Sequence, residues 1–310
     1  MSRKPDLHQV PSNPLPSSTM QPTDRRSASA LTRGVPPQLF ALLAIISVQL
    51  GSAVSKSLFQ SIGPLGTTFL RLVYAALLLL LIWRPRLHGY TRRHLLLIAL
   101  FGITIAAMNS VFYTAIARIP LGIAVSLEFV GPLGVALMQS RHLKDLVWAA
   151  LAAGGILLLA PIGPTHLDPL GVGLALLAGC FWGAYILLNV QMGRASTGGA
   201  GLALSMTVAA CVIAPLGSIN GGMSLLTPRV LLIGFAVAIL STVIPFSLEL
   251  EALRRLPSRV FGILMSIEPA IGALMGFLVL GEVIGLREMM AIALVIAASV
   301  GVSLEGNAHQ

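Results

Sequence analysis

Charged side chains are scarce in this sequence. They make up 10% of its 310 residues, whereas hydrophobic residues make up 56% and the mean hydropathy is +0.89. A soluble protein needs about a quarter of its residues charged. Too few polar side chains remain here to cover a water-facing surface, which excludes an ordinary soluble fold.

Cysteine is nearly absent as well. Cys180 and Cys211 both lie within apolar runs, where we expect buried thiols. A disulfide framework or a metal site needs more ligands at suitable spacing. We also find no metal-ligand cluster, no phosphate-binding glycine loop and no nucleophile elbow in the sequence. We therefore expect no metal, no cofactor and no enzymatic activity.

The positive net charge does not indicate nucleic-acid binding. It amounts to +9, with an isoelectric point of 10.6. Proteins that bind nucleic acid gather basic residues on one exposed face or in a motif. Here the basic residues lie between apolar runs, where they set orientation in a bilayer. We expect a lipid bilayer as a partner and no nucleic acid.

Apolar runs close to the ~20 residues needed to cross a bilayer recur along the chain. They are continuous rather than alternating, which indicates helices and not a β-barrel. We predict an all-α integral membrane protein with ten transmembrane helices. The predicted spans are 37–58, 64–83, 95–117, 120–138, 146–162, 170–190, 201–219, 230–250, 260–280 and 286–304.

The distribution of Lys and Arg predicts the orientation. Residues 1–36 are rich in Pro, Ser and Thr, so we expect a disordered cytoplasmic tail. With the N-terminus inside, fifteen Lys and Arg residues fall on the inner side, four on the outer side, and Arg71 within a span. This bias predicts a multi-pass protein with both termini in the cytoplasm.

A short motif occurs twice. Residues 122–128, GIAVSLE, match residues 262–268, GILMSIE, as Gly-Ile-x-x-Ser-x-Glu. The copies lie in the fourth and ninth spans, which cross the membrane in opposite directions. We therefore predict two inverted five-helix repeats, residues 37–162 and 170–304. Secondary transporters commonly have this construction, with the substrate site at the repeat interface.

Four ionisable residues lie in or near the ends of predicted spans, where a charge costs about 2.5–3.5 kcal/mol or more. Glu128 lies about eight residues from the outer side and Glu268 about eight from the inner side, so both are about 12 Å deep. Arg71 lies about seven residues from the outer side of its span. Lys56 lies near the outer end of the first span.

Prolines follow both glutamates. Pro132 has no N–H, so the helical hydrogen bond to the carbonyl of Glu128 is missing. Pro269 likewise frees the carbonyl of Met265, one turn before Glu268. At membrane depth, free carbonyls are tolerated mainly where they are buried in protein or line a wet cavity. We therefore expect each half to present a carboxylate and a loosened helical turn to one central space.

Each of these residues has two interpretations. The glutamates contact a substrate or a coupling proton, or they pair with Arg71 or sit protonated between helices. Lys56 belongs to the site or snorkels to the membrane surface. Asn109 and Tyr113, one turn apart in the third span, line a polar cavity or hydrogen-bond between helices.

Two other patterns predict ordinary packing and surface features. Glu249 and Glu251 lie next to two arginines at the inner end of the eighth span, so we expect a surface charge cluster. Glycines four residues apart, at positions 179 and 183 and at 272 and 276, indicate faces where helices pack closely.

Several stretches together resemble a known family. Residues 51–59, 119–133, 236–249 and 256–269 are similar to the EamA-type branch of the drug/metabolite transporter superfamily, and within it to the threonine/homoserine exporters. The resemblance covers most of residues 37–304. The N-terminal tail of this chain is longer than the corresponding segment of those exporters.

The resemblance implies proton-driven efflux of threonine, homoserine and related amino acids through a bacterial inner membrane. A zwitterionic amino acid matches one fixed cation and one fixed anion in a buried cavity. Arg71 with Glu128 or Glu268 supplies such a pair, and the other glutamate carries the proton. The alternative is a broader exporter of drugs or metabolites, which the aromatic content of 6% disfavours. The sequence does not predict the oligomeric state.

Overall fold

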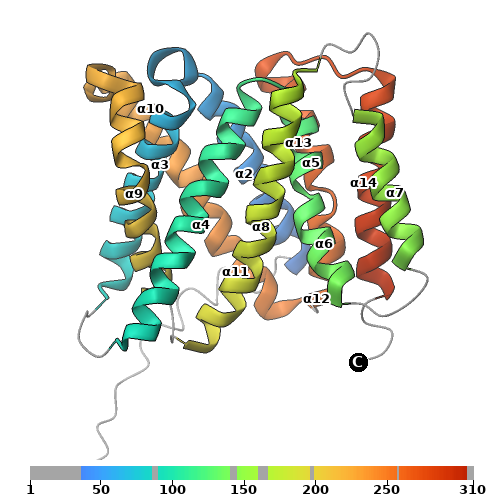
Figure 1. Cartoon of the computed structure of the whole chain (residues 1–310), viewed down its shortest axis with the longest axis horizontal. Coiled ribbons are helices and arrows are strands. Elements are labelled where there is room, and N and C mark those ends of the chain that lie inside the picture. Colours follow the sequence, from blue (N-terminus) through green and yellow to red (C-terminus); the bar gives the residue numbers. More distant parts are fainter. Residues whose placement is uncertain are drawn as a thin grey trace, which may run out of the picture. The chain divides into compact units, whose positions relative to one another are not determined.

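The computed structural model describes residues 36–85, 90–139, 145–159, 167–195, 199–256 and 258–305, and the predicted tail lies outside them apart from Pro36. The elements over these residues are all helical. Figure 1 labels most of them: α2 (Pro37–Lys56), α3 (Phe59–Trp83), α4 (Arg92–Ile116), α5 (Leu121–Glu128), α6 (Val130–Gln139), α7 (Asp145–Leu159), α8 (Pro169–Ala195), α9 (Ala200–Gly221), η1 (Gly222–Leu226), α10 (Pro228–Ala238), η2 (Ile239–Val243), α11 (Ile244–Arg255), α12 (Ser258–Met265), α13 (Glu268–Leu280) and α14 (Leu286–Glu305).

The helices support a membrane protein. Within the described residues, seven helices are long and apolar enough to cross a bilayer, and two shorter apolar helices cover Leu121–Val135 and Val147–Leu158. Large apolar side chains also point outward from the bundle, for example Leu81, Leu232 and Phe277. A water-soluble protein does not expose this much apolar surface. The total of ten crossings stays a prediction.

Three predicted spans are not regular α-helices. The fourth breaks after Glu128, between α5 and α6, and the ninth breaks just before Glu268, between α12 and α13. The eighth contains η2, a π-helical turn. Pro269 occupies the first turn of α13, where its missing N–H costs no helical bond. Both motif glutamates therefore lie at helix ends inside the bundle.

Helices from distant parts of the sequence pack side by side, including α3 with α9, α4 with α8, α2 with α11 and α5 with α13 (Figure 1). In the last pair, α5 carries the first motif copy and α13 begins with Glu268, the last residue of the second copy. A Cβ added to Gly122 of α5 would lie 2.5 Å from the Cα of Ala273 on α13, so only glycine allows this contact. Close packing is confirmed at Gly179, where a Cβ would lie 2.7 Å from the Glu128 carbonyl oxygen, whereas at Gly183 and Gly272 the nearest atoms would be 3.3 and 3.2 Å away.

The prediction of buried thiols is wrong. Cys180 and Cys211 are both free and exposed at the surface of the bundle. Apolar sequence around a residue indicates a buried position in a soluble protein. In a membrane helix it is equally compatible with a face turned toward lipid.

Candidate functional site

Arg71 is held between two other helices. From α3, its Nη1 donates a hydrogen bond to the hydroxyl of Tyr113 on α4 at 3.0 Å. Its Nη2 donates to the backbone carbonyl of Ser241 in η2 at 3.2 Å. The guanidinium carbon also lies 5.4 Å from the centre of the Tyr113 ring. A hydrogen bond or ion pair from Arg71 to a glutamate, one of the two interpretations of these residues, is not among its described contacts.

The carbonyl that Arg71 uses is available because of Pro245. In an α-helix the Ser241 carbonyl accepts from the N–H of residue 245, which proline lacks. The π-turn changes the register here, since Ile244 donates to Ile239, five residues back. Because Ile244 donates to Ile239 and not to Leu240, the Leu240 carbonyl is free as well, and the Ser47 hydroxyl on α2 donates to it at 2.7 Å. π-turns of this kind often occur at functional sites.

Gly51 allows α2 to approach this turn. A Cβ at Gly51 would lie 2.2 Å from Ser241 Oγ and 3.1 Å from Ser241 N. Any side chain there would push η2 away from α2 and disturb the carbonyl that anchors Arg71. The glycine in the stretch 51–59 therefore has a direct structural role beside the site.

Glu268 begins α13 and is almost fully buried, at 7% exposed. Its Oε1 accepts a hydrogen bond from Nε2 of Gln49 on α2 at 2.9 Å. The other carboxylate oxygen, Oε2, has no hydrogen-bond partner among the described residues, and neither does Oε1 of Gln49. Each of these two hydrogen-bonded side chains thus keeps one buried acceptor atom without a donor among the described residues.

Glu128 ends α5 and is 8% exposed. Its carboxylate interacts electrostatically with both Glu268 and Arg71. Its backbone carbonyl lies against α8, because a Cβ on Gly179 would come within 2.7 Å of that oxygen. The expectation that this carbonyl faces the central space is therefore wrong: helix α8 covers it.

Four buried polar atoms in this region lack a hydrogen-bond partner among the described residues: Gln49 Oε1, Arg71 Nε, Ser241 Oγ and Glu268 Oε2. Buried polar groups in proteins are normally satisfied, because an unpaired one costs about 1–3 kcal/mol. We call these four residues with Tyr113 and Glu128 the central cluster. The cluster offers an unpaired donor on the cation Arg71 and unpaired acceptors on the anion Glu268 and its neighbour Gln49. This arrangement suits a small ligand that carries both charges.

Two other predicted site residues have separate contacts. Asn109 lies one turn before Tyr113 on α4, and its Nδ2 donates within the same helix to the carbonyl of Ile105 at 2.8 Å. Lys56 ends α2 and forms an ion pair with Glu282, with Nζ 2.5 Å from Oε1. This pair lies at the end of the helices, where the Leu121 N–H also donates to Glu282, and not in the central cluster.

The surface cluster predicted at the end of the eighth span is only partly confirmed. Glu251 pairs with Arg255, as expected for neighbouring turns of one helix. Glu249 is instead half-buried, and it interacts electrostatically with Glu268 and Tyr185. Among the described residues, no three His, Cys, Asp or Glu side chains gather closely enough to hold a metal ion.

Comparison with known proteins gives close relatives over most of the chain. A family model described as the EamA-like transporter family matches residues 169–304. A threonine/homoserine exporter, RhtA, of Salmonella typhimurium is 42% identical over 278 residues, which are 88% of this chain and 94% of the exporter. The exporter of that name from Escherichia coli is also 42% identical, over 86% and 91% of the two chains.

More distant proteins match as well. An uncharacterized transporter of Bacillus subtilis, YwfM, is 25% identical over 83% of this chain and 90% of its own length. A crystal structure of another protein matches with a TM-score of 0.58 over 85% of this chain and 96% of that chain. At 14% identity, that match supports the fold alone. The named relatives are transporters and not enzymes.

Proposed function

This chain belongs to the EamA-like transporter family, and we propose that it exports threonine, homoserine and similar small amino acids in exchange for protons. The observation that carries the proposal is the central cluster, which offers buried groups of both charges with unpartnered atoms. The named function of the relatives at 42% identity supports the same substrate class. The location would be a bacterial inner membrane.

A zwitterionic amino acid fits the cluster in one orientation. Its carboxylate lies on the guanidinium of Arg71, which Tyr113 and the Ser241 carbonyl hold in place. Its ammonium lies between Glu268 Oε2 and Gln49 Oε1, the two acceptors without a donor. Charge-assisted hydrogen bonds in a buried site are the strong ones, so both ends of the substrate contribute to selection.

Proton coupling follows from the two motif glutamates. Glu128 and Glu268 interact electrostatically inside the bundle, so their negative charges repel each other. One of them carries a proton when no substrate is bound, and the ammonium of the substrate displaces it. Competition between proton and ammonium for one pair of carboxylates is sufficient for antiport.

Alternating access rests on two inverted repeats, residues 37–162 and 170–304, with both termini in the cytoplasm. The repeated motif supports this arrangement, because Ser126 donates to Gly122 and Ser266 to Gly262 in the same local geometry. Both copies lie next to a helix break, as in transporters whose sites are built from discontinuous helices. Helix α5, which ends at Glu128, packs on α13, which begins at Glu268.

Efflux in intact cells tests the proposal. Cells expressing the protein should keep internal threonine or homoserine about tenfold below the level of control cells, a difference that an uncoupler abolishes. Glu128→Gln and Glu268→Gln should lose this effect at normal expression. Glu288→Gln, a glutamate in the first turn of α14, is the matched control and should export normally. Unchanged efflux in both cluster variants would refute the proposal.

A further inference from the structure

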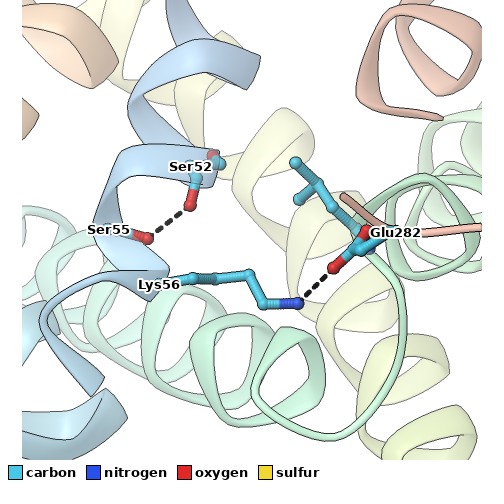
Figure 2. A network of polar contacts seen from close by, with 5 residues as sticks. Ser52, Ser55, Lys56 and Glu282 are labelled. Atoms are coloured by element: carbon cyan, nitrogen blue, oxygen red, sulfur yellow. Dashed lines mark hydrogen bonds and ion pairs between the residues drawn. The ribbon is translucent and has the colours of Figure 1, made fainter. Parts of the chain in front are cut away.

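A second polar feature lies at one end of the bundle, away from the central cluster. Figure 2 shows the Lys56 side chain reaching from the end of α2 to Glu282. Glu282 follows the left-handed Gly281 that ends α13, and its Oε2 accepts from the N–H of Leu121 at 2.8 Å. One carboxylate therefore connects α2, α5 and the end of α13.

A cleft of about 430 Å³ opens beside this ion pair. Its lining is apolar apart from the pair and one serine, and consists of Ala53, Val54, Lys56, Ser57, Val279, Leu280 and Glu282. Small-molecule sites typically have this volume and this mixture, with a few polar groups among apolar ones. The Lys56 and Glu282 side chains, which line the cleft, are 19% and 13% exposed.

Gly276 fixes the position of the carboxylate. A Cβ on Gly276 would lie 2.4 Å from Glu282 Oε2, so glycine is needed for the side chain to lie against α13. The Leu121 N–H then occupies Oε2 and leaves Oε1 for a cation. In the described structure that cation is the ammonium of Lys56.

We propose that this cleft is a second substrate site, in which a zwitterionic amino acid inserts between Lys56 and Glu282. The substrate carboxylate replaces Glu282 at Lys56, and the substrate ammonium replaces Lys56 at Glu282 Oε1. The two charges of the substrate replace the two partners of this largely buried ion pair, so neither Lys56 nor Glu282 is left unpaired while the substrate is bound. In the predicted orientation this is the outer end, so the site receives substrate leaving the central cluster. The proposal rests on the proposed amino-acid transport.

The separation of the two sites fits successive binding. Leu121 and Glu128 are the two ends of α5, which places them about 10 Å apart along the helix. Glu268 and Glu282 likewise lie at opposite ends of α13. Insertion of the substrate also breaks the ion pair that joins the end of α2 to the end of α13, so passage through the site loosens this end of the bundle.

Measuring the affinity for substrate separately from each face of the membrane tests the proposal. In right-side-out and inside-out membrane vesicles, the half-saturating concentration of radiolabelled threonine is measured from each face. Lys56→Gln and Glu282→Gln should raise it about fivefold from the outer face, as expected for loss of one partly exposed ionic contact, and leave the inner face unchanged. Lys56→Arg, which keeps the cation, should retain the outer affinity.

Arg118→Gln is the matched control. Arg118 pairs with Asp168 at 2.8 Å on the connection that precedes α5, and neither residue lines the cleft. The hydrogen bond from Arg118 holds the pKa of Asp168 below its usual range. The variant removes an ion pair near the same end and should leave both affinities unchanged.

A substrate analogue separates binding from a purely structural role. Threonine amide keeps the ammonium and lacks the carboxylate, so it should compete less well than threonine from the outer face of the wild type. In Lys56→Gln the difference between the two competitors from the outer face should become smaller, because only the carboxylate contact with Arg71 then remains. Unchanged outer affinity, or an equal loss on both faces, would overturn the second site while transport by the wild type stands. Wild-type vesicles that move neither threonine nor homoserine would instead refute the proposed function.

Discussion

Substitution of Gly51 by alanine tests the geometry that positions Arg71. The added Cβ would lie 2.2 Å from Ser241 Oγ, but 3.1 Å from the next nearest atoms, which are Ser241 N and Leu240 Cβ. Overpacking of this kind costs about 1–3 kcal/mol. Since the closest conflict is with a hydroxyl, Ser241→Ala should relieve most of it.

A double-mutant cycle measures this relief. Ser241→Ala alone should be nearly neutral, because the hydroxyl has no hydrogen-bond partner among the described residues. The double variant should recover about 1–2 kcal/mol relative to the sum of the single changes. The recovered stability is measured by thermal unfolding in detergent at one fixed scan rate, where each kcal/mol shifts the apparent Tm by about 2–4 °C.

Gly154→Ala on α7 is the control for the cycle. Among the described residues, nothing beyond the backbone of α7 itself lies within 4 Å of a Cβ added there, so the variant should be as stable as the wild type or more stable, since alanine favours helix. If Ser241→Ala fails to rescue Gly51→Ala, then α2 and η2 are not in contact through this hydroxyl. The described anchoring of Arg71 would then be incorrect.

Three further substitutions probe the cluster and its support. Arg71→Lys should lower kcat/KM for threonine about tenfold or more in vesicle transport, because one ammonium does not replace the two guanidinium bonds to Tyr113 and Ser241. Wild-type kinetics in this variant would contradict the assigned contacts. Tyr113→Phe removes one of those bonds and should reduce kcat/KM by a smaller factor, with little change in apparent Tm. Gly179→Ala should lower the apparent Tm by several degrees, since its Cβ would lie 2.7 Å from the backbone oxygen of Glu128; a wild-type Tm would show that α8 does not cover that carbonyl.

The membrane class and the two motif glutamates were predictable from sequence. Apolar runs of helical length identify the membrane class, and seven described helices confirm it. The repeat identified Glu128 and Glu268 because a buried carboxylate is costly and stands out in an apolar span. Their burial, at 8% and 7% exposed, agrees with that expectation.

The partners of these charges were not predictable, because they lie far away in the sequence. Gln49 is 219 residues from Glu268, and Lys56 is 226 residues from Glu282. Glu282 also falls in a predicted link between spans, where a carboxylate attracts no notice. A polar glutamine inside the first apolar run was the available signal for Gln49.

The anchor of Arg71 was partly encoded in the sequence. Pro245, four residues after Ser241, predicts a free carbonyl at that position. Which side chain uses the carbonyl depends on how α3 packs against η2, and local sequence does not determine that packing. The loosened turns expected from Pro132 and Pro269 correspond to helix breaks beside Glu128 and Glu268, but their exact positions were not predictable, since hydropathy does not distinguish a broken apolar span from a continuous one.

Transport by the purified protein in liposomes tests the central claim most directly. Radiolabelled threonine or homoserine is followed after a pH gradient is imposed, for the wild type, Glu268→Gln and the control Glu288→Gln. The account predicts gradient-driven movement in the wild type and the control, and its loss in Glu268→Gln. Folded protein that moves neither substrate, or a Glu268→Gln variant that still responds to the gradient, would contradict it.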